Sequence, residues 1–120
     1  MPYIDFSPSQ LEIEHALEML LPKVQNIINN HYEERFSRIK PPKIEVKRGS
    51  KYWKLIKVDL NQLTTSRSVY CFVRRSDGAV LKAASWSTPQ LKTKNPICGF
   101  ITEDECIDCF YAYGVRHVTH

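Results

Sequence analysis

A predicted β-hairpin is the feature of this sequence that most restricts its fold. Residues 68–75 (SVYCFVRR) are rich in β-branched and aromatic side chains, and residues 79–84 (AVLKAA) form a second short apolar run. Between them, Ser76-Asp77-Gly78 favours a tight turn, because Asp bonds to nearby backbone N–H groups and Gly accepts a positive φ. The centre of the chain is therefore predicted to hold two paired antiparallel strands.

The N-terminal segment has the pattern of an amphipathic helix. Ser7 is a candidate N-cap, Pro8 suits the first helical position, and Gln10 is placed to complete a capping box. Apolar residues then recur at spacings of three and four, at Ile13, Leu17, Leu20, Leu21, Val24, Ile27 and Ile28, with Phe36 and Ile39 as an extension. Pro22 interrupts this stripe, so the pattern fits one kinked helix over residues 8–38 or two helices that meet at Leu21.

Short alternating segments follow the helix, which Pro41-Pro42 ends. Residues 43–47 and 52–59 are predicted strands joined by a turn at Gly49-Ser50, and residues 61–66 are a predicted loop. The predicted fold is a single α+β domain over residues 1–120, in which the N-terminal helix packs on an antiparallel sheet of three to five strands within residues 43–84. The tail, residues 86–120, is predicted to be irregular, apart from a short helix near residues 103–111 and an extended piece at residues 115–118.

Positive charge is concentrated on the predicted sheet. The net charge of the chain is +4, but residues 40–94 hold thirteen basic and three acidic side chains, which gives +10, while residues 1–39 and 95–120 each carry −3. A strongly basic sheet favours an anionic partner. Neither a membrane-spanning apolar run nor a signal-peptide pattern is present in the sequence, so membrane insertion and export are not expected.

The third predicted strand suggests a nucleic-acid-binding face. Strict alternation places Tyr70 and Phe72 on one side with Arg74, and Val69 and Val73 on the other. A face that combines rings and cations is typical of sheets that bind nucleic acid. The candidate binding residues are Lys51, Lys54, Lys57, Tyr70, Phe72, Arg74, Arg75, Lys82 and Trp86. In the other interpretation, Tyr70 and Phe72 pack under the N-terminal helix and the lysines only solvate the edge of the sheet. The alternative function is then an interaction with another protein, or oligomerisation through the sheet edges.

The cysteines of the tail have the spacing of a zinc knuckle. Cys106 and Cys109 form a C-x-x-C pair, followed by His117 and His120, and Cys98 is a substitute for one histidine. A zinc site would use Cys98, Cys106, Cys109 and His117; reduced structural thiols without a cofactor are the other interpretation.

The sequence contains no pattern typical of a catalytic site. The acidic residues of the tail cluster at residues 103–108, as at a solvated helix start or a contact for a basic partner, and do not form a separated catalytic pair. Cys98 with His117 is a formal nucleophile pair only, and the four glycines of the chain form no phosphate-binding loop. The protein is therefore predicted not to be an enzyme.

The segment from Val69 to Pro89 resembles one found in small proteins encoded by tailed bacteriophages, which pair a VY-x-F-V strand with a G-x-V-x-K-x-A-S-W strand. The matching residues are Val69, Tyr70, Phe72, Val73, Gly78, Val80, Lys82, Ala84, Ser85 and Trp86. Tyr113-Gly114-Val115-Arg116 is similar to the ending of some of these proteins, whereas residues 87–92 lack the basic, glycine-bearing sequence common there. The resemblance covers under half of the chain and implies a viral accessory protein, located in the host cytoplasm or in the virion. It implies no activity. The predicted partner of this protein is then nucleic acid or, alternatively, a host or viral protein.

Overall fold

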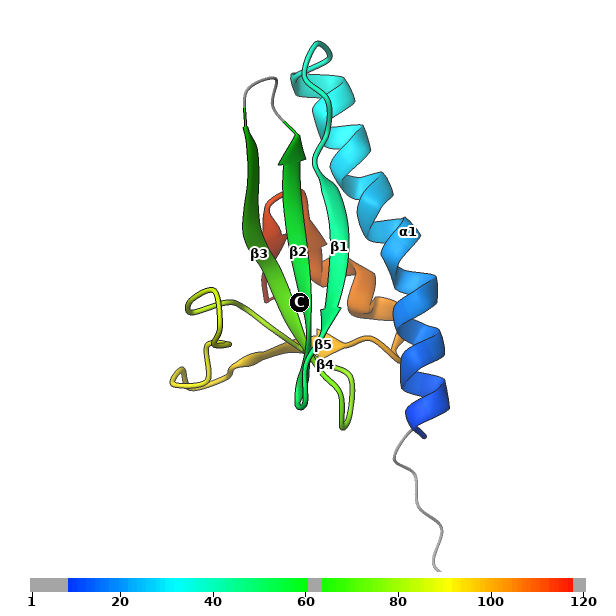
Figure 1. The fold of residues 1–120 in the computed structure, drawn as a ribbon. Helices are drawn as coiled ribbons and strands as arrows, with labels where there is room; N and C mark the ends of the chain where they lie inside the picture. The colour runs from blue at the N-terminus through cyan, green and yellow to red at the C-terminus, as the bar shows by residue number, and fades with distance from the viewer. Residues whose placement is uncertain (1–8, 61–63, 118–120) are drawn as a thin grey trace, which may run out of the picture.

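The computed structural model describes residues 9–60 and 64–117. Its elements are α1 (Gln10–Arg35), β1 (Lys43–Arg48), β2 (Tyr52–Leu60), β3 (Thr65–Arg74), β4 (Ala79–Leu81), β5 (Ile97–Phe100), the 3₁₀ helix η1 (Asp104–Cys109), β6 (Phe110–Tyr111) and β7 (Gly114–Val115). The strands β1 to β5 form one antiparallel sheet in sequence order, beside which α1 runs (Figure 1). The fold is α+β, with the N-terminal helix packed on an antiparallel sheet, as predicted.

The helix α1 is continuous through Pro22, so the chain has one N-terminal helix rather than two. Its N-cap is Ser9, whose side chain accepts a hydrogen bond from the Glu12 N–H at 3.2 Å. The predicted cap at Ser7 lies outside the described residues. The helix ends at Arg35, where the Phe36 N–H donates to the Tyr32 carbonyl at 2.7 Å. The predicted extension of the helix to residue 38 is therefore wrong.

One stripe of α1 is buried, as the apolar spacing predicts. Its buried side chains are Ile13, Leu17, Leu20, Val24 and Ile28. Ile27 and Leu21 are partly covered, whereas Phe36 and Ile39 are 40% and 53% exposed and do not extend the stripe. Gln25 ties the helix to the sheet, because its side chain accepts from the Ile44 N–H at 2.9 Å and donates to the Pro42 carbonyl at 2.9 Å.

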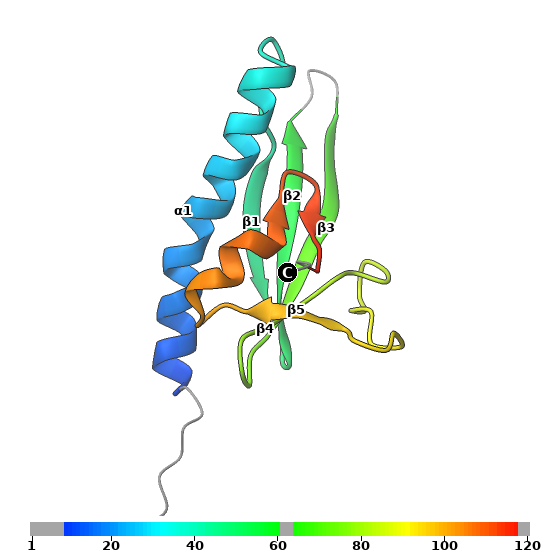
Figure 2. The ribbon, with the colours of Figure 1, turned by 180° about the vertical axis from the view of Figure 1, so that it is seen from behind.

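The tail is more ordered than predicted. Beyond residue 86, β5 extends the main sheet by pairing with β4, and β6 pairs with β7. Figure 2 shows η1 and the β6–β7 pair in front of the sheet, beside α1, and the side chains of α1, η1 and β6 share one core with the sheet. We call this covered side of the sheet the inner face and the opposite side the outer face. The prediction that residues 86–120 are mostly irregular and the prediction that the sheet ends at residue 84 are therefore both wrong. The strands of the tail are short and have no clear apolar pattern of their own, so tertiary packing holds them in place.

The β3–β4 turn is formed as the sequence predicts. Gly78 has a φ of +79°, and its N–H donates to the Arg74 carbonyl at 2.7 Å. The Asp77 carboxylate accepts from the Ala79 N–H at 3.0 Å. It also forms a bidentate pair with the Arg74 guanidinium, at 3.0 and 2.7 Å. The turn thus anchors Arg74 at the end of β3.

A β-bulge in β3 changes the direction of one aromatic side chain. Leu55 of β2 pairs with Cys71, but the next residue, Ile56, pairs with Val69. Tyr70 is therefore the extra residue of the bulge and joins the core on the inner face beside Cys71. Because the alternation shifts at this point, the predicted grouping of Tyr70 with Phe72 is wrong.

The inner face is held by aromatic contacts between β3 and the tail. The Tyr70 ring stacks on Phe110 with ring centroids 6.3 Å apart and planes 5° apart, and its hydroxyl donates to the Tyr111 carbonyl. Burial raises the pKa of the Tyr70 hydroxyl, so it stays protonated as a donor.

Among the described residues, no helix is both long enough and apolar enough to span a membrane.

Candidate nucleic-acid interface

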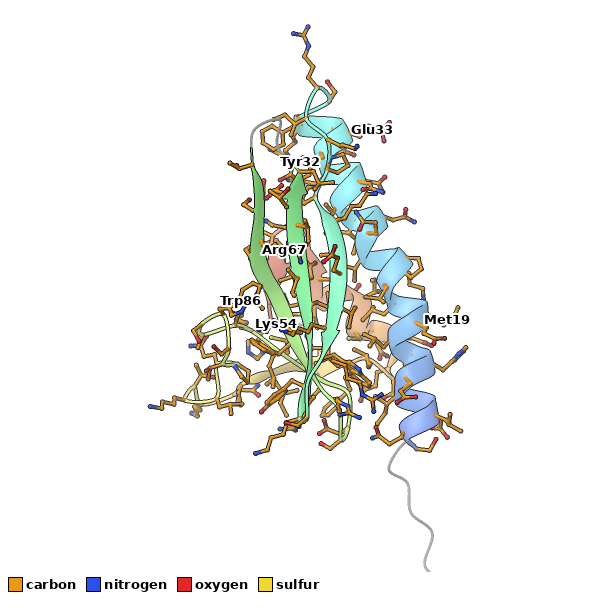
Figure 3. The ribbon with its side chains drawn as sticks, viewed as in Figure 1. Met19, Tyr32, Glu33, Lys54, Arg67 and Trp86 are labelled. Atoms are coloured by element: carbon orange, nitrogen blue, oxygen red, sulfur yellow. The ribbon has the colours of Figure 1, made fainter. Side chains whose placement is uncertain are left out.

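The outer face of the sheet is the candidate site, because no described helix or strand packs on it (Figure 1). Figure 3 shows Lys54, Arg67 and Trp86 on this side of the molecule. Arg67 of β3 and Glu45 of β1 form an ion pair at 3.1 Å, and β2 lies between these two strands. Their side chains therefore cross β2 and help to cover Ile56 and Val58, which are 5% and 3% exposed.

Lys54 lies between two aromatic rings at the lower part of this face. Its ammonium is 4.3 Å from the centroid of the Trp86 ring and 5.9 Å from that of Phe72. Phe72 pairs with Lys54 across β2 and β3 and is only 2% exposed, whereas Trp86 is 46% exposed. Phe72 is therefore a buried ring at the base of the site, and Trp86 is an exposed ring that a ligand can contact.

A small open concavity lies beside Lys54. It has a volume of about 290 Å³, and its lining includes four cations and two rings: Lys47, Arg48, Lys51, Lys54, Tyr52 and Phe72. None of the described residues that line it is acidic. A hollow of this size is at the lower limit for a small-molecule pocket, about 300 Å³, and it suits a phosphate group of a longer ligand better than an enclosed substrate.

The acidic residues of the basic central segment do not neutralise this concavity. Glu45 is paired with Arg67, and Asp77 with Arg74 at 2.7 Å. The hydrogen bond from Arg74 holds the pKa of the Asp77 carboxyl below its usual value. Asp59 lies opposite Ser66 of β3, at the other end of β2. There, burial and the nearby Asp59 carboxylate raise the pKa of Tyr32 of the helix. Within the described residues, Lys47, Lys51 and Lys54 form no ion pair.

The structure separates the predicted binding residues. Lys54, Phe72 and Trp86 come together on the outer face, with Lys51 at its lower edge and Arg74 beside them but paired with Asp77. Tyr70 is 3% exposed in the core, so it offers no ring to a ligand.

Three further candidates lie away from the outer face. Lys57 places its ammonium 5.2 Å from the centroid of Tyr113, on the inner side, where Tyr113 contacts His31 of α1. Arg75 donates to the carbonyls of Gly49 and Ser50 at 2.8 and 3.1 Å. It therefore braces the β1–β2 turn.

The last candidate, Lys82, directly follows β4 at the start of the loop that carries Trp86. It lines a second, polar concavity with Lys94 and His117. The predicted binding set is thus corrected for Lys57, Tyr70, Arg75 and Lys82. Tyr70 is turned to the inner face by the bulge in β3, and Lys57 is three residues from Lys54 along β2, so it points to the other side.

Lys47, Arg48 and Tyr52 are site residues that the sequence reasoning did not select. Lys47 pairs with Lys54 on adjacent strands, so the two side chains share the outer face. The alternation of residues 43–47 contains this signal, since it places Lys43, Glu45 and Lys47 on the face opposite Ile44.

The predicted zinc ligands are only partly brought together. The thiols of Cys106 and Cys109 both pack on Gly99, and the Cys109 thiol donates to the Cys98 carbonyl at 3.0 Å. Burial raises the pKa of Cys106 to about 12, and also raises the pKa of Cys98 and Cys109. His117 lies beside Lys82 instead, and the described residues contain no group of three side chains arranged to hold a metal ion.

The sequence pattern of a family of unknown function, DUF7717, matches residues 6–110. Because this match spans more than half of the chain, the protein belongs to that family. No curated protein and no solved structure gives a significant match. The family is of unknown function. The resemblance to bacteriophage proteins stays a prediction.

Proposed function

We propose that the protein binds nucleic acid through the outer face of its sheet. Lys47, Arg48, Lys51 and Lys54 contact phosphates there, and Trp86 contacts a base. The observation that carries this proposal is the concavity beside Lys54, which gathers four cations around two rings and has no carboxylate among the described residues of its lining.

Both components of this site match the chemistry of nucleic acid. Ammonium and guanidinium groups attract the phosphate backbone without regard to sequence, and they release counterions on binding. An exposed indole ring offers a face on which a base stacks. In the part of the chain that the structure describes, Lys47, Lys51 and Lys54 form no ion pair, so a phosphate does not have to displace a carboxylate of those residues.

A salt series on labelled oligonucleotides tests the proposal. Four phosphate contacts predict a slope of log affinity against log salt of roughly −3 for single strands. The variant Lys47→Gln/Lys51→Gln/Lys54→Gln should reduce that slope to roughly −1, because about one phosphate contact is left.

A charge-matched control separates a local site from the overall charge. Lys23→Gln/Arg35→Gln/Arg38→Gln removes the same three charges from exposed positions on α1 and just after it. This variant should bind nearly as the wild type does. Equal losses in both triple variants, or no binding of any oligonucleotide at low salt, would contradict the proposal and leave an acidic protein partner as the alternative.

A further inference from the structure

Trp86 is presented on a fixed loop rather than on a free segment. The loop that follows β4 is closed by a bridge between Ala83 and Pro89. The Ala84 and Ser85 N–H groups both donate to the Thr88 carbonyl, at 2.9 and 3.1 Å. A ring held in this way loses little conformational entropy when a ligand stacks on it.

One face of the Trp86 ring is already occupied by a cation. The Lys54 ammonium lies 4.3 Å from the ring centroid, at a distance typical of a cation–π contact. A stacked base and this ammonium compete for the same ring face. Lys54 is one of the four cations of the concavity, so a phosphate bound there gives the displaced ammonium a new partner.

We propose that the ligand is single-stranded, and that an unpaired base takes the place of the Lys54 ammonium on the Trp86 ring while that ammonium moves to a phosphate. This inference rests on the proposed function. A duplex cannot make the exchange, because its bases are stacked on one another inside the helix, whereas every unpaired base has a free π face.

Tryptophan fluorescence reports the exchange directly. The chain has two tryptophans, and Trp53 is 5% exposed, so it serves as an internal reference for Trp86. Titration with oligo-dT or oligo-U of about 15 nucleotides should quench the Trp86 emission to saturation, since a site of this class covers about 4–16 nucleotides. A blunt-ended duplex of two separate strands, with the same number of phosphates and no unpaired base, should bind without this quenching.

Three variants test the role of the ring by the anisotropy of labelled oligonucleotides. Trp86→Leu should weaken single-strand binding by roughly 5- to 100-fold, the value expected for one stacked base, and leave duplex binding unchanged. Trp86→Tyr should restore most of the single-strand affinity, because it returns a ring. Lys54→Met should lower the salt slope by about 0.7 while keeping the quenching.

The outcomes separate this inference from the proposed function. Equal, salt-dependent binding of single strands and duplex, unaffected by Trp86→Leu, would overturn the exchange and leave the phosphate-binding face intact. If neither form binds, both proposals fail. Because Trp86 is an exposed loop residue, Trp86→Leu is expected to unfold at the same temperature as the wild type, and this is checked by circular dichroism.

Discussion

The ammonium of Lys54 and the ring of Trp86 lie 4.3 Å apart, although one belongs to the second strand and the other to the loop after the fourth. This contact joins the basic strand β2 to the exposed ring that follows β4. It brings together two of the chemical groups that nucleic acid binds, a cation and an accessible π face.

Tyr70 is expected to support the fold and not the ligand. Tyr70→Phe removes the buried hydroxyl that donates to Tyr111, and it leaves that carbonyl without this partner. We expect a loss of about 1–2 kcal/mol in the free energy of unfolding, measured by urea denaturation, and unchanged oligonucleotide affinity. Weaker binding by a stably folded Tyr70→Phe would contradict the placement of this residue in the core.

The Arg74–Asp77 pair is expected to make the turn sensitive to acid. The pKa of Asp77 is lowered from 3.8 by the hydrogen bond from Arg74, so the carboxylate favours the folded state above that pH. Its contribution is lost as the pH falls below 3.8 through the lower folded value. Asp77→Asn keeps an oxygen for the Ala79 N–H but loses the charge.

This variant should cost about 0.5–1 kcal/mol at pH 7, because the pair is partly exposed. The difference from the wild type should shrink as the pH falls from 3.8 through the lower folded pKa of Asp77. Urea unfolding at a series of pH values measures this, and a difference that is constant down to low pH would refute the ion pair as its cause.

Gly99 is expected to be required by the two thiols that pack on it. A Cβ atom at this position would lie 2.9 Å from the Cys109 sulfur and 3.7 Å from that of Cys106. Gly99→Ala should therefore destabilise the protein by about 1–3 kcal/mol through overpacking. Adding Cys109→Ala removes the closer sulfur, so the double variant should lose less than the two single variants together. Additive losses would show that the close approach is not the cause.

The thiols are expected to differ in reactivity. Cys71, Cys106 and Cys109 are buried, and burial raises the pKa of each, whereas Cys98 is partly exposed and Lys82 partly offsets the rise of its pKa. Since the thiolate is the reactive form, Ellman's reagent at pH 8 should modify Cys98 first. The other three should react only when denaturant unfolds the chain, and Cys98→Ser should remove the fast phase. A fast phase that persists in Cys98→Ser would contradict this assignment.

Much of the fold follows from local sequence patterns. The helix stripe from Ile13 to Ile28 and the Ser76-Asp77-Gly78 turn are encoded by spacing and by residue type, and both are formed. The helix runs through Pro22, because tertiary packing of its apolar face outweighs the loss of one hydrogen bond. The short strands β5 to β7 have two to four residues each, too few to show a period. These strands depend on tertiary pairing: β5 pairs with β4 at the edge of the sheet, and β6 pairs with β7 directly after η1.

The candidate site was predicted only in part, for a reason that lies in β3. Alternation assigns Tyr70 to the same side as Phe72, but the bulge inserts one residue and turns Tyr70 toward the core. No glycine or proline in residues 65–74 marks this bulge. Phe72 keeps its predicted side because it lies beyond the bulge, where it pairs directly with Lys54. The contact with Trp86 depends on the path of a loop, which strand periodicity does not determine.

The most direct test of the central claim is an NMR titration of the ¹⁵N-labelled protein with unlabelled oligo-dT at low salt. We expect chemical-shift changes in the Trp86 indole N–H and in the backbone amides of Lys47, Tyr52, Lys54 and Phe72, with little change along α1 or in β6 and β7. Changes confined to the helix and the β6–β7 pair, or no changes at all, would contradict a nucleic-acid-binding outer face.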